Sequence, residues 1–409
     1  MTAWLWAQFH RIARPHAGLL ILATAVALTI VGIVAVGTTH PQAAAQQGRR
    51  WLPIALLAAV ICALPHPRTI GRLSYLGFAG VLLLLIVLLM PGVPDWLVTE
   101  RNGARSWIDM GPMNLQPSEL AKIAFVLALA WYLRYRSSFR TLRGLLVPFV
   151  IMFIPVGLIV QQPDLGTAMV FPPTLFAMLI AAGAKLRHIT ALLSIGVLTI
   201  AVNVCIIAFD APPWMHVLQP HQEARIEAMI WPDRFADGEA YQQKMAKRVV
   251  GSGGLTGYGL ERSSVLLGRK ANHLPHDHND MPFAIIVNRW GLAGGTAVVL
   301  LYLLLLSSFV LVASRAKEPF TRLATVGLAG VIFAQAAINM AVTVGLLPIT
   351  GITLPLVSYG GSSLVASFIM VGLAVNFASR RPAPLIRPSF EFDEPDPAAS
   401  PRQIRGARR

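Results

Sequence analysis

Ionisable side chains are unusually dense at residues 273–280, where the sequence reads His-Leu-Pro-His-Asp-His-Asn-Asp. Imidazoles and carboxylates this close together can move protons or bind a metal ion. The spacing of His273, His276 and His278 is irregular for one helical face, and Pro275 interrupts it. Zinc sites usually combine two closely spaced ligands with others from distant parts of the chain, and the sequence does not identify such distant ligands. Loop histidines beside a negatively charged substrate are therefore the favoured interpretation.

This cluster lies just before a long apolar segment, in a chain of 409 residues that is 55% hydrophobic and 13% charged. A soluble protein of that length needs more charge to cover its surface. Apolar runs of about 20 residues, enough to cross a ~30 Å hydrocarbon core as helices, recur throughout. We therefore predict an all-α polytopic membrane protein. The net charge of +15 comes from basic residues spread over loops and a tail, which predicts membrane topology and no binding of nucleic acid.

We predict ten transmembrane helices, with a large extracytoplasmic loop at 210–280 between the seventh and the eighth. The predicted spans are 17–37, 51–64, 74–93, 118–133, 144–161, 164–184, 189–209, 281–313, 323–347 and 353–379. With a cytoplasmic N-terminus, the inside segments carry twenty Lys and Arg residues, against four in the short outside loops. This asymmetry follows the positive-inside rule, so we expect both termini in the cytoplasm.

The predicted domain organisation is one transmembrane domain at 1–379, followed by a disordered, basic cytoplasmic tail at 380–409. Within the outer loop, amphipathic character near 239–250 predicts a short helix along the membrane interface.

The stretch Gln116-Pro-Ser-Glu-Leu-Ala-Lys122 puts charge at the start of the fourth span. Pro117 suits the first position of a helix, and Ser118 could cap it. Glu119 and Lys122 are three residues apart and share a helical face. Each would cost roughly 2.5–3.5 kcal/mol at mid-bilayer, so we expect them to pair and to face a cavity. Either a structural ion pair or a substrate contact fits this pattern.

Two further stretches combine helix-breaking and polar residues. Gln162-Pro-Asp-Leu-Gly-Thr167 contains Asp164, an intramembrane acid that is a functional candidate, although capping of the sixth span is the plainer interpretation. In Gly351–Ser363, paired glycines and hydroxyls indicate close helix packing or a cavity lining in the last span.

Taken together and in this order, the four stretches resemble the SEDS family of cell-wall polymerases, the RodA-like, FtsW-like and SpoVE-like proteins. The resemblance runs from roughly residue 15 to residue 380, and its most specific motif is Leu354-Pro-Leu-Val-Ser-Tyr-Gly-Gly-Ser-Ser363. It implies a ten-helix protein of the bacterial cytoplasmic membrane. The implied substrate is lipid II, an undecaprenyl-diphosphate-linked disaccharide peptide, which such proteins polymerise at the outer face. The implied partner, besides membrane lipid, is a class B penicillin-binding protein transpeptidase.

The family's essential aspartate matches Asp280, which we expect to be the catalytic base. Diphosphate is a good leaving group, so one base that takes the acceptor hydroxyl proton is enough, contributing ~10²–10⁴-fold. Arginine, lysine or a divalent cation (Mg²⁺ or Mn²⁺) could stabilise the charge on the diphosphate, and no cofactor is certain. The residues expected to bind substrate are Arg105, Trp107, Glu119, Lys122, Asp164, Arg225, His278, Arg289, Ser358 and Ser362.

The sequence departs from the family pattern after Asp280, where two acidic residues are replaced by Asn288 and Arg289. Arg289 could take the place of a metal that the acids would bind. Alternatively, it could pair with Glu119 or Asp164 inside the bundle.

Two other functions fit polar groups in a ten-helix bundle: a flippase for lipid II, and an inactive scaffold of the elongation or division machinery. A flippase needs charges along a complete crossing path, whereas a polymerase needs them clustered outside. Asp280, Arg105 and the histidines are predicted outside, and the inner halves of the spans hold almost no charge. This distribution favours the enzyme. The stretch Val344–Gly351 leans towards the RodA-like branch.

Overall fold

The computed structural model describes residues 2–91, 93–94, 97–98, 105–109, 111, 114–209, 220–231, 239–260 and 277–379. The predicted tail at 380–409 and the residues His273 and His276 lie outside these ranges. The described chain is mostly helical, as predicted from its apolar runs, and includes one two-stranded hairpin.

The helical elements, in chain order, are α1 Thr2–Gly37, α2 Pro41–Gln46, η1 Gln47–Trp51, α3 Leu52–Ala63, α4 Pro67–Leu89, α5 Pro117–Leu133, η2 Ser138–Arg140, α6 Leu142–Val160, α7 Leu165–Ala168, α8 Phe171–Ala182, α9 Leu186–Ala208, α10 Pro220–Ile230, α11 Glu239–Ser252, α13 Asp277–Asp280, α14 Pro282–Arg315, α15 Pro319–Val344 and α16 Gly361–Ser379. The strands β1 Ile108–Asp109 and β2 Asn114–Leu115 pair antiparallel between α4 and α5. Proline occupies one of the first two positions of α4, α5, α14 and α15, where its missing N–H removes no helical hydrogen bond.

Eight helical segments in the described ranges are long and apolar enough to cross a membrane. The two remaining predicted spans correspond to α3, with 12 residues, and α5, with 17 residues. The second predicted span is wrong at its start, because α2, η1 and α3 form an uninterrupted helical run from Pro41 to Ala63.

The tenth predicted span is also wrong at its start, because residues 351–360 form a loop and α16 begins at Gly361. Pro355 lacks an N–H and Leu356 has a φ of 70°, so neither continues a helix easily. The eighth predicted span is broken at Gly291, whose φ of 66° and ψ of −165° separate two helical halves of α14. The expected helix near 239–250 is present as α11.

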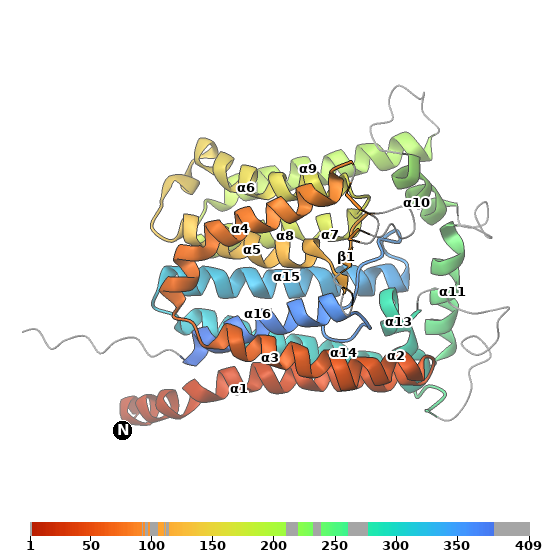
Figure 1. Cartoon of the computed structure of the whole chain (residues 1–409), viewed down its shortest axis with the longest axis horizontal. Helices are drawn as coiled ribbons and strands as arrows, with labels where there is room; N and C mark the ends of the chain where they lie inside the picture. The colour runs from red at the N-terminus through yellow and green to blue at the C-terminus, as the bar shows by residue number, and fades with distance from the viewer. Residues whose placement is uncertain are drawn as a thin grey trace, which may run out of the picture. The chain divides into compact units, whose positions relative to one another are not determined.

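The centre of the bundle is formed by α5, α15 and α16. The helix α16 packs on α3, α1 and α5, and α15 packs on α14, α8 and α5 (Figure 1). Seventy-two per cent of the α16 span is buried, compared with 6% of the α9 span, which is therefore peripheral. The buried polar residues of these helices, such as Lys122, Gln335 and Asn376, consequently face other protein groups.

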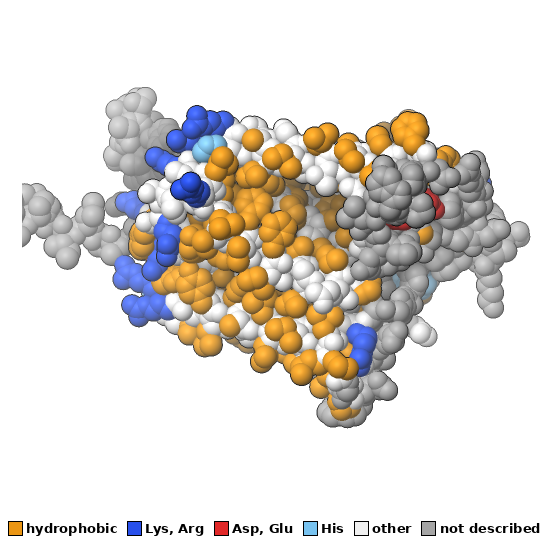
Figure 2. All heavy atoms as spheres, turned by 90° about the horizontal axis from the view of Figure 1, so that it is seen from above, with side chains coloured by type: hydrophobic (Ala, Val, Ile, Leu, Met, Phe, Trp, Pro, Cys, Tyr) orange, Lys and Arg blue, Asp and Glu red, His pale blue; other side chains and the backbone are white. Residues whose placement is uncertain are grey.

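Basic side chains gather at one end of the helices (Figure 2). They come from the α3–α4, α5–α6, α8–α9 and α14–α15 connections and from the helix ends beside them: Arg68, Arg72, Arg134, Arg136, Arg140, Arg143, Lys185, Arg187, Arg315, Lys317 and Arg322. Figure 1 shows these connections at the end opposite to α11 and α13. The two ends of the bundle therefore differ strongly in charge.

Close packing of α3 against α16 gives a first prediction. A Cβ atom on Gly372 would lie 2.2 Å from the carbonyl oxygen of Ala59, so Gly372→Ala must separate the two helices. We expect it to lower the free energy of unfolding by about 1–3 kcal/mol. The matched control is Gly80→Ala, where nothing lies within 4 Å of the added carbon. Thermal unfolding in detergent measures both, and equal melting temperatures for the two variants would contradict the prediction.

Candidate functional site

The charged pair on α5 is buried in the centre of the bundle. The Nζ atom of Lys122 lies 2.8 Å from Oε1 of Glu119, and the two residues are 1% and 4% exposed. Nζ also donates to Oε1 of Gln335 on α15, at 2.8 Å. The predicted pairing is therefore confirmed, and the ammonium group has two acceptors in a place where isolated charge is costly.

The polar contacts continue from Gln335 into the loop before α16. The Nε2 atom of Gln335 donates to the carbonyl oxygen and to the hydroxyl of Thr353, at 3.1 and 3.2 Å. The Thr353 hydroxyl in turn lies 2.8 Å from that of Ser363 at the start of α16. One network thus fixes α5, α15 and α16 relative to the loop.

Asp164 caps α7, as the plainer interpretation of the sequence predicts. Its Oδ1 atom accepts from the backbone N–H of Thr167 at 3.0 Å. Its Oδ2 atom accepts from Nε2 of Gln116 and from the hydroxyl of Ser118, at 3.3 and 3.2 Å. The predicted capping role of Ser118 is wrong, because α5 begins at Pro117 with Gln116 as its N-cap, and the hydroxyl binds Asp164 instead.

Ser362 joins the hairpin to α16. Its hydroxyl accepts from the backbone N–H of Gln116 at 3.2 Å and donates to the carbonyl oxygen of Asn114. Arg105 donates to the carbonyl oxygen of Val93 at 3.3 Å, and Trp107 is half-buried on the same segment, directly before β1. The hairpin is therefore held against the starts of α5 and α16.

Ser358 stabilises the loop of residues 351–360 rather than pointing away from it. It is 3% exposed, and its hydroxyl accepts from the backbone N–H of Leu354 at 2.7 Å. Its carbonyl oxygen accepts from Nε2 of Gln47 at 3.1 Å. The motif that carries much of the family resemblance is thus a folded turn beside η1.

The segment that ends in Asp280 is anchored through its backbone. Nδ2 of Asn339, on α15, donates to the carbonyl oxygens of Asp280 and Ile352, at 2.6 and 2.7 Å. The backbone N–H of Tyr359 donates to the carbonyl oxygen of His278 at 2.9 Å. The His278 ring lies 4.3 Å from that of His40 and 5.8 Å from that of Tyr359. The half-buried Asp280 side chain is therefore carried by a fixed backbone.

Arg289 pairs with neither Glu119 nor Asp164, so that expectation is wrong. Its Nε atom donates to the hydroxyl of Thr38 at the end of α1, at 3.0 Å, and Nη1 donates to the carbonyl oxygen of Gly259 at 3.4 Å. The acids have other partners because they lie on α5 and before α7, whereas Arg289 lies where α14 meets α1.

Arg225 is set apart from this network. It lies on α10, which packs on α9 and α11. Figure 1 shows α10 at the same end of the bundle as α13, but near α9. The structure brings together Glu119, Lys122, Asp164, His278, Asp280, Ser358 and Ser362 through the contacts above.

Gln335 and Asn339 are the main residues that sequence reasoning missed. They are 1% exposed and four residues apart on α15, so they project from one face of a mostly apolar helix. That spacing of two amides in a predicted span was the available signal, since polar groups in membrane helices need internal partners.

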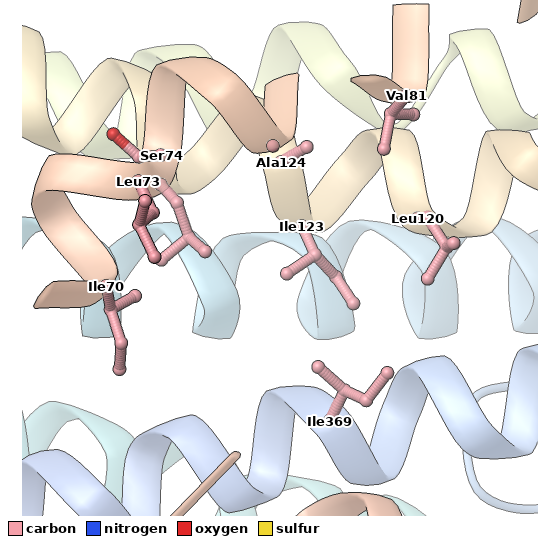
Figure 3. Close-up of a pocket in the computed structure, with 10 residues that line it drawn as sticks. Ile70, Leu73, Ser74, Val81, Leu120, Ile123, Ala124 and Ile369 are labelled. Atoms are coloured by element: carbon pink, nitrogen blue, oxygen red, sulfur yellow. The ribbon is translucent and has the colours of Figure 1, made fainter. Parts of the chain in front are cut away.

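A groove with almost entirely apolar lining runs along a neighbouring face of α5. It has a volume of about 290 Å³ and lies between α4, α5 and α16 (Figure 3). Leu120, Ile123 and Leu127 line it from α5, so this helix separates an apolar face from the face that carries Glu119 and Lys122. Leu120 is adjacent to Glu119, so one end of the groove lies close to the polar network.

Comparison with known proteins agrees with this geometry. The FTSW_RODA_SPOVE family model, described as cell cycle protein, matches residues 12–382. The chain belongs to this family. The probable peptidoglycan glycosyltransferase FtsW of Mycobacterium bovis is 33% identical over 334 residues, which cover 81% of this chain and 60% of that relative. Peptidoglycan glycosyltransferase MrdB of Escherichia coli is 30% identical, over 81% of this chain and 84% of that protein.

The fold is shared as well. A chain from a solved structure titled "Structural coordination of polymerization and crosslinking by a peptidoglycan synthase complex" superposes with a TM-score of 0.71 at 28% identity. The match covers 88% of this chain and 96% of that one.

Arg289, which the sequence suggested as a replacement for a metal ion, does not itself fit as a ligand of a divalent cation. Its guanidinium is a hydrogen-bond donor and carries positive charge, whereas Asn288 has both a donor nitrogen and, among the described residues, a buried Oδ1 atom without a hydrogen-bond partner. Hard cations prefer oxygen ligands. Among the residues that the structure describes, no group of three or more His, Cys, Asp and Glu side chains is placed to hold a metal ion.

The buried pair generates a second prediction. Lys122→Met leaves the Glu119 carboxylate buried without its cation, and we expect a loss of about 3–5 kcal/mol in the free energy of unfolding. The double variant Glu119→Leu/Lys122→Met removes both charges and should be less destabilised than the single one. Lys317→Met, at an exposed site, is the control. Unfolding in detergent measures all three, and a double variant less stable than Lys122→Met would refute the coupling.

Proposed function

We propose that this chain is a peptidoglycan glycosyltransferase that polymerises lipid II at the outer face of the cytoplasmic membrane, with Asp280 as general base. The observation that carries the proposal is the anchoring of the Asp280 backbone by Asn339, in a network that also contains the family motifs around Lys122 and Thr353. A catalytic base must be held in a fixed position to take its proton efficiently.

The proposed reaction joins two lipid-linked saccharides. Asp280 takes the proton of a sugar hydroxyl on the acceptor. The electron pair left on that oxygen then attacks the anomeric carbon of the donor. The bond between that carbon and the diphosphate oxygen breaks, and the diphosphate leaves with the electron pair. Cationic side chains at this end of the bundle stabilise the charge of the leaving group. No step requires a second carboxylate.

The groove beside α5 suits the hydrocarbon part of such a substrate. Its lining is apolar apart from Ser74, whose hydroxyl donates to the carbonyl oxygen of Gly71. A polyprenyl chain buried there would leave its diphosphate near the end of the groove marked by Leu120, within one residue of Glu119. The substrate head group would then meet the polar network.

The sidedness that this reaction requires is consistent with the charge distribution. We propose that α3, extended by α2 and η1, and α5 also cross the bilayer, which gives ten crossings with the eight long apolar segments. The basic connections α3–α4, α5–α6, α8–α9 and α14–α15 then lie on the cytoplasmic side and Asp280 on the outer side, as expected from the positive-inside rule. Both termini are cytoplasmic in this arrangement.

A transpeptidase partner of the class B penicillin-binding protein type completes the proposal. The support is the likeness to a chain of a complex whose title names polymerisation and crosslinking together. A flippase is the competing function, because buried polar groups also occur in transporters. The concentration of the network at one end, away from the basic connections, favours the polymerase.

Asp280→Asn tests the proposal. With purified chain and lipid II, we expect glycan strand formation to fall by about 10²-fold or more, because the base is lost. Asp109→Asn is the matched control: it removes a carboxylate from the hairpin near the same network, and polymer should still form.

Gel filtration and thermal unfolding must show that the Asp280→Asn protein remains folded. Polymer formation by this variant at the wild-type rate would disprove the role of Asp280. If the wild-type chain moves lipid II between the two leaflets of vesicles but makes no polymer, that result would support the flippase instead.

A further inference from the structure

A break in α14, eleven residues after Asp280, and the loop that fills it form a distinct unit. We infer that Asn288 and Arg289 are positioning residues, which lock the glycine-rich loop 253–259 and the end of α1 onto the first half of α14. This lock keeps His278 and Asp280 in place. The inference rests on the proposed function and assigns a task to two residues that the proposed reaction does not itself name.

The loop satisfies backbone groups that the break leaves without helical partners. The carbonyl oxygens of Asn288 and Arg289 accept from the backbone N–H groups of Tyr258 and Gly259, at 3.0 and 2.9 Å. Beyond the break, the N–H of Leu292 donates to the carbonyl oxygen of Gly254 at 2.8 Å. Unpaired backbone groups are costly in a membrane, so the break and the loop require each other.

Two glycines make this contact sterically feasible. A Cβ atom on Gly257 would lie 2.3 Å from the carbonyl oxygen of Arg289, and one on Gly291 would lie 2.3 Å from that of Leu255. Both glycines have positive φ, at 74° and 66°. The loop therefore fits against the broken helix as backbone on backbone.

The two side chains extend the lock to neighbouring elements. Nδ2 of the fully buried Asn288 donates to the carbonyl oxygen of Val249 at 3.2 Å and to the hydroxyl of Ser252 at 2.8 Å, both on α11. Arg289, 4% exposed, joins the loop to α1 through Gly259 and Thr38. A carboxylate at either position would face a carbonyl oxygen, of Val249 or Gly259, with no proton to donate. The hydroxyls of Ser252 and Thr38 already donate to the carbonyl oxygens of Val249 and Ala35. Donor side chains are therefore needed for this arrangement.

The lock lies on both sides of the candidate catalytic segment. The first half of α14 begins at Pro282, directly after Asp280 and Met281. Thr38 is two residues from His40, whose ring contacts that of His278. Arg289 thus connects the helix that follows Asp280 to the turn that contacts His278. Loss of the hydrogen bonds of this guanidinium would therefore free both that helix and that turn to move.

Hydrogen–deuterium exchange and lipid II polymerisation, measured on the purified full chain, test the lock. We expect Arg289→Met to raise amide exchange at 257–259 and at Tyr359, whose N–H binds the carbonyl oxygen of His278, by about tenfold or more, since these hydrogen bonds then open locally. The kcat should fall by a similar factor, with the KM for lipid II unchanged. Arg289→Lys, which keeps a donor and the charge, should recover part of both.

Thr38→Val provides a second variant that removes one acceptor without touching α14, in case Arg289→Met does not fold. Like Arg289→Met, Thr38→Val should raise amide exchange and lower kcat. Arg322→Met, an exposed arginine at the basic end, is the control and should change neither.

Unchanged exchange in both variants would overturn the lock, whatever the activity. A raised KM with unchanged exchange would instead assign Arg289 to direct contact with the diphosphate. If wild-type chain makes no polymer, the proposed function fails by itself. The lock is then decided by the exchange at 257–259 and at Tyr359 alone.

Discussion

The positive charge of Lys122 at the centre of an apolar bundle is the constraint on which the rest of the site depends. Burial of an ammonium group is tolerated only with close acceptors, and these come from Glu119 on the same helix and Gln335 on α15. Gln335 also binds Thr353. The need of the Lys122 ammonium group for an acceptor therefore also sets the position of the loop before α16. That loop in turn holds the backbone of His278 through Tyr359.

Irregular backbone in this protein occurs where other protein groups satisfy it, as a membrane environment demands. The loop of residues 351–360 is held by Gln335, Asn339 and Gln47. The break in α14 is filled by the loop 253–259. The first stretch contacts the Asp280 segment through Tyr359 and Asn339, and the first half of α14 joins the break to that segment, so both belong to one end of a mostly regular bundle.

Local patterns were sufficient to predict several parts of this site. The pairing of Glu119 with Lys122 follows from a spacing of three on a helix, and the cap provided by Asp164 follows from a carboxylate placed before a helix. The start of α5 at Pro117 follows from the geometry of proline. The start of α16 was predicted incorrectly, because the apolar content of 353–360 resembles that of a span although Leu356 turns the chain.

The sequence by itself determined the membrane class, most of the helices, the charge asymmetry between the two ends and the family, because apolar length, basic loops and short motifs are local properties. Only the tertiary structure decided which groups meet. Arg289 binds Thr38 and Gly259 instead of an acid, and Asn339 binds the backbone of Asp280. These partners are distant in the chain, and their hydrogen bonds depend on helix rotation and on a break at Gly291 that no residue pattern specifies.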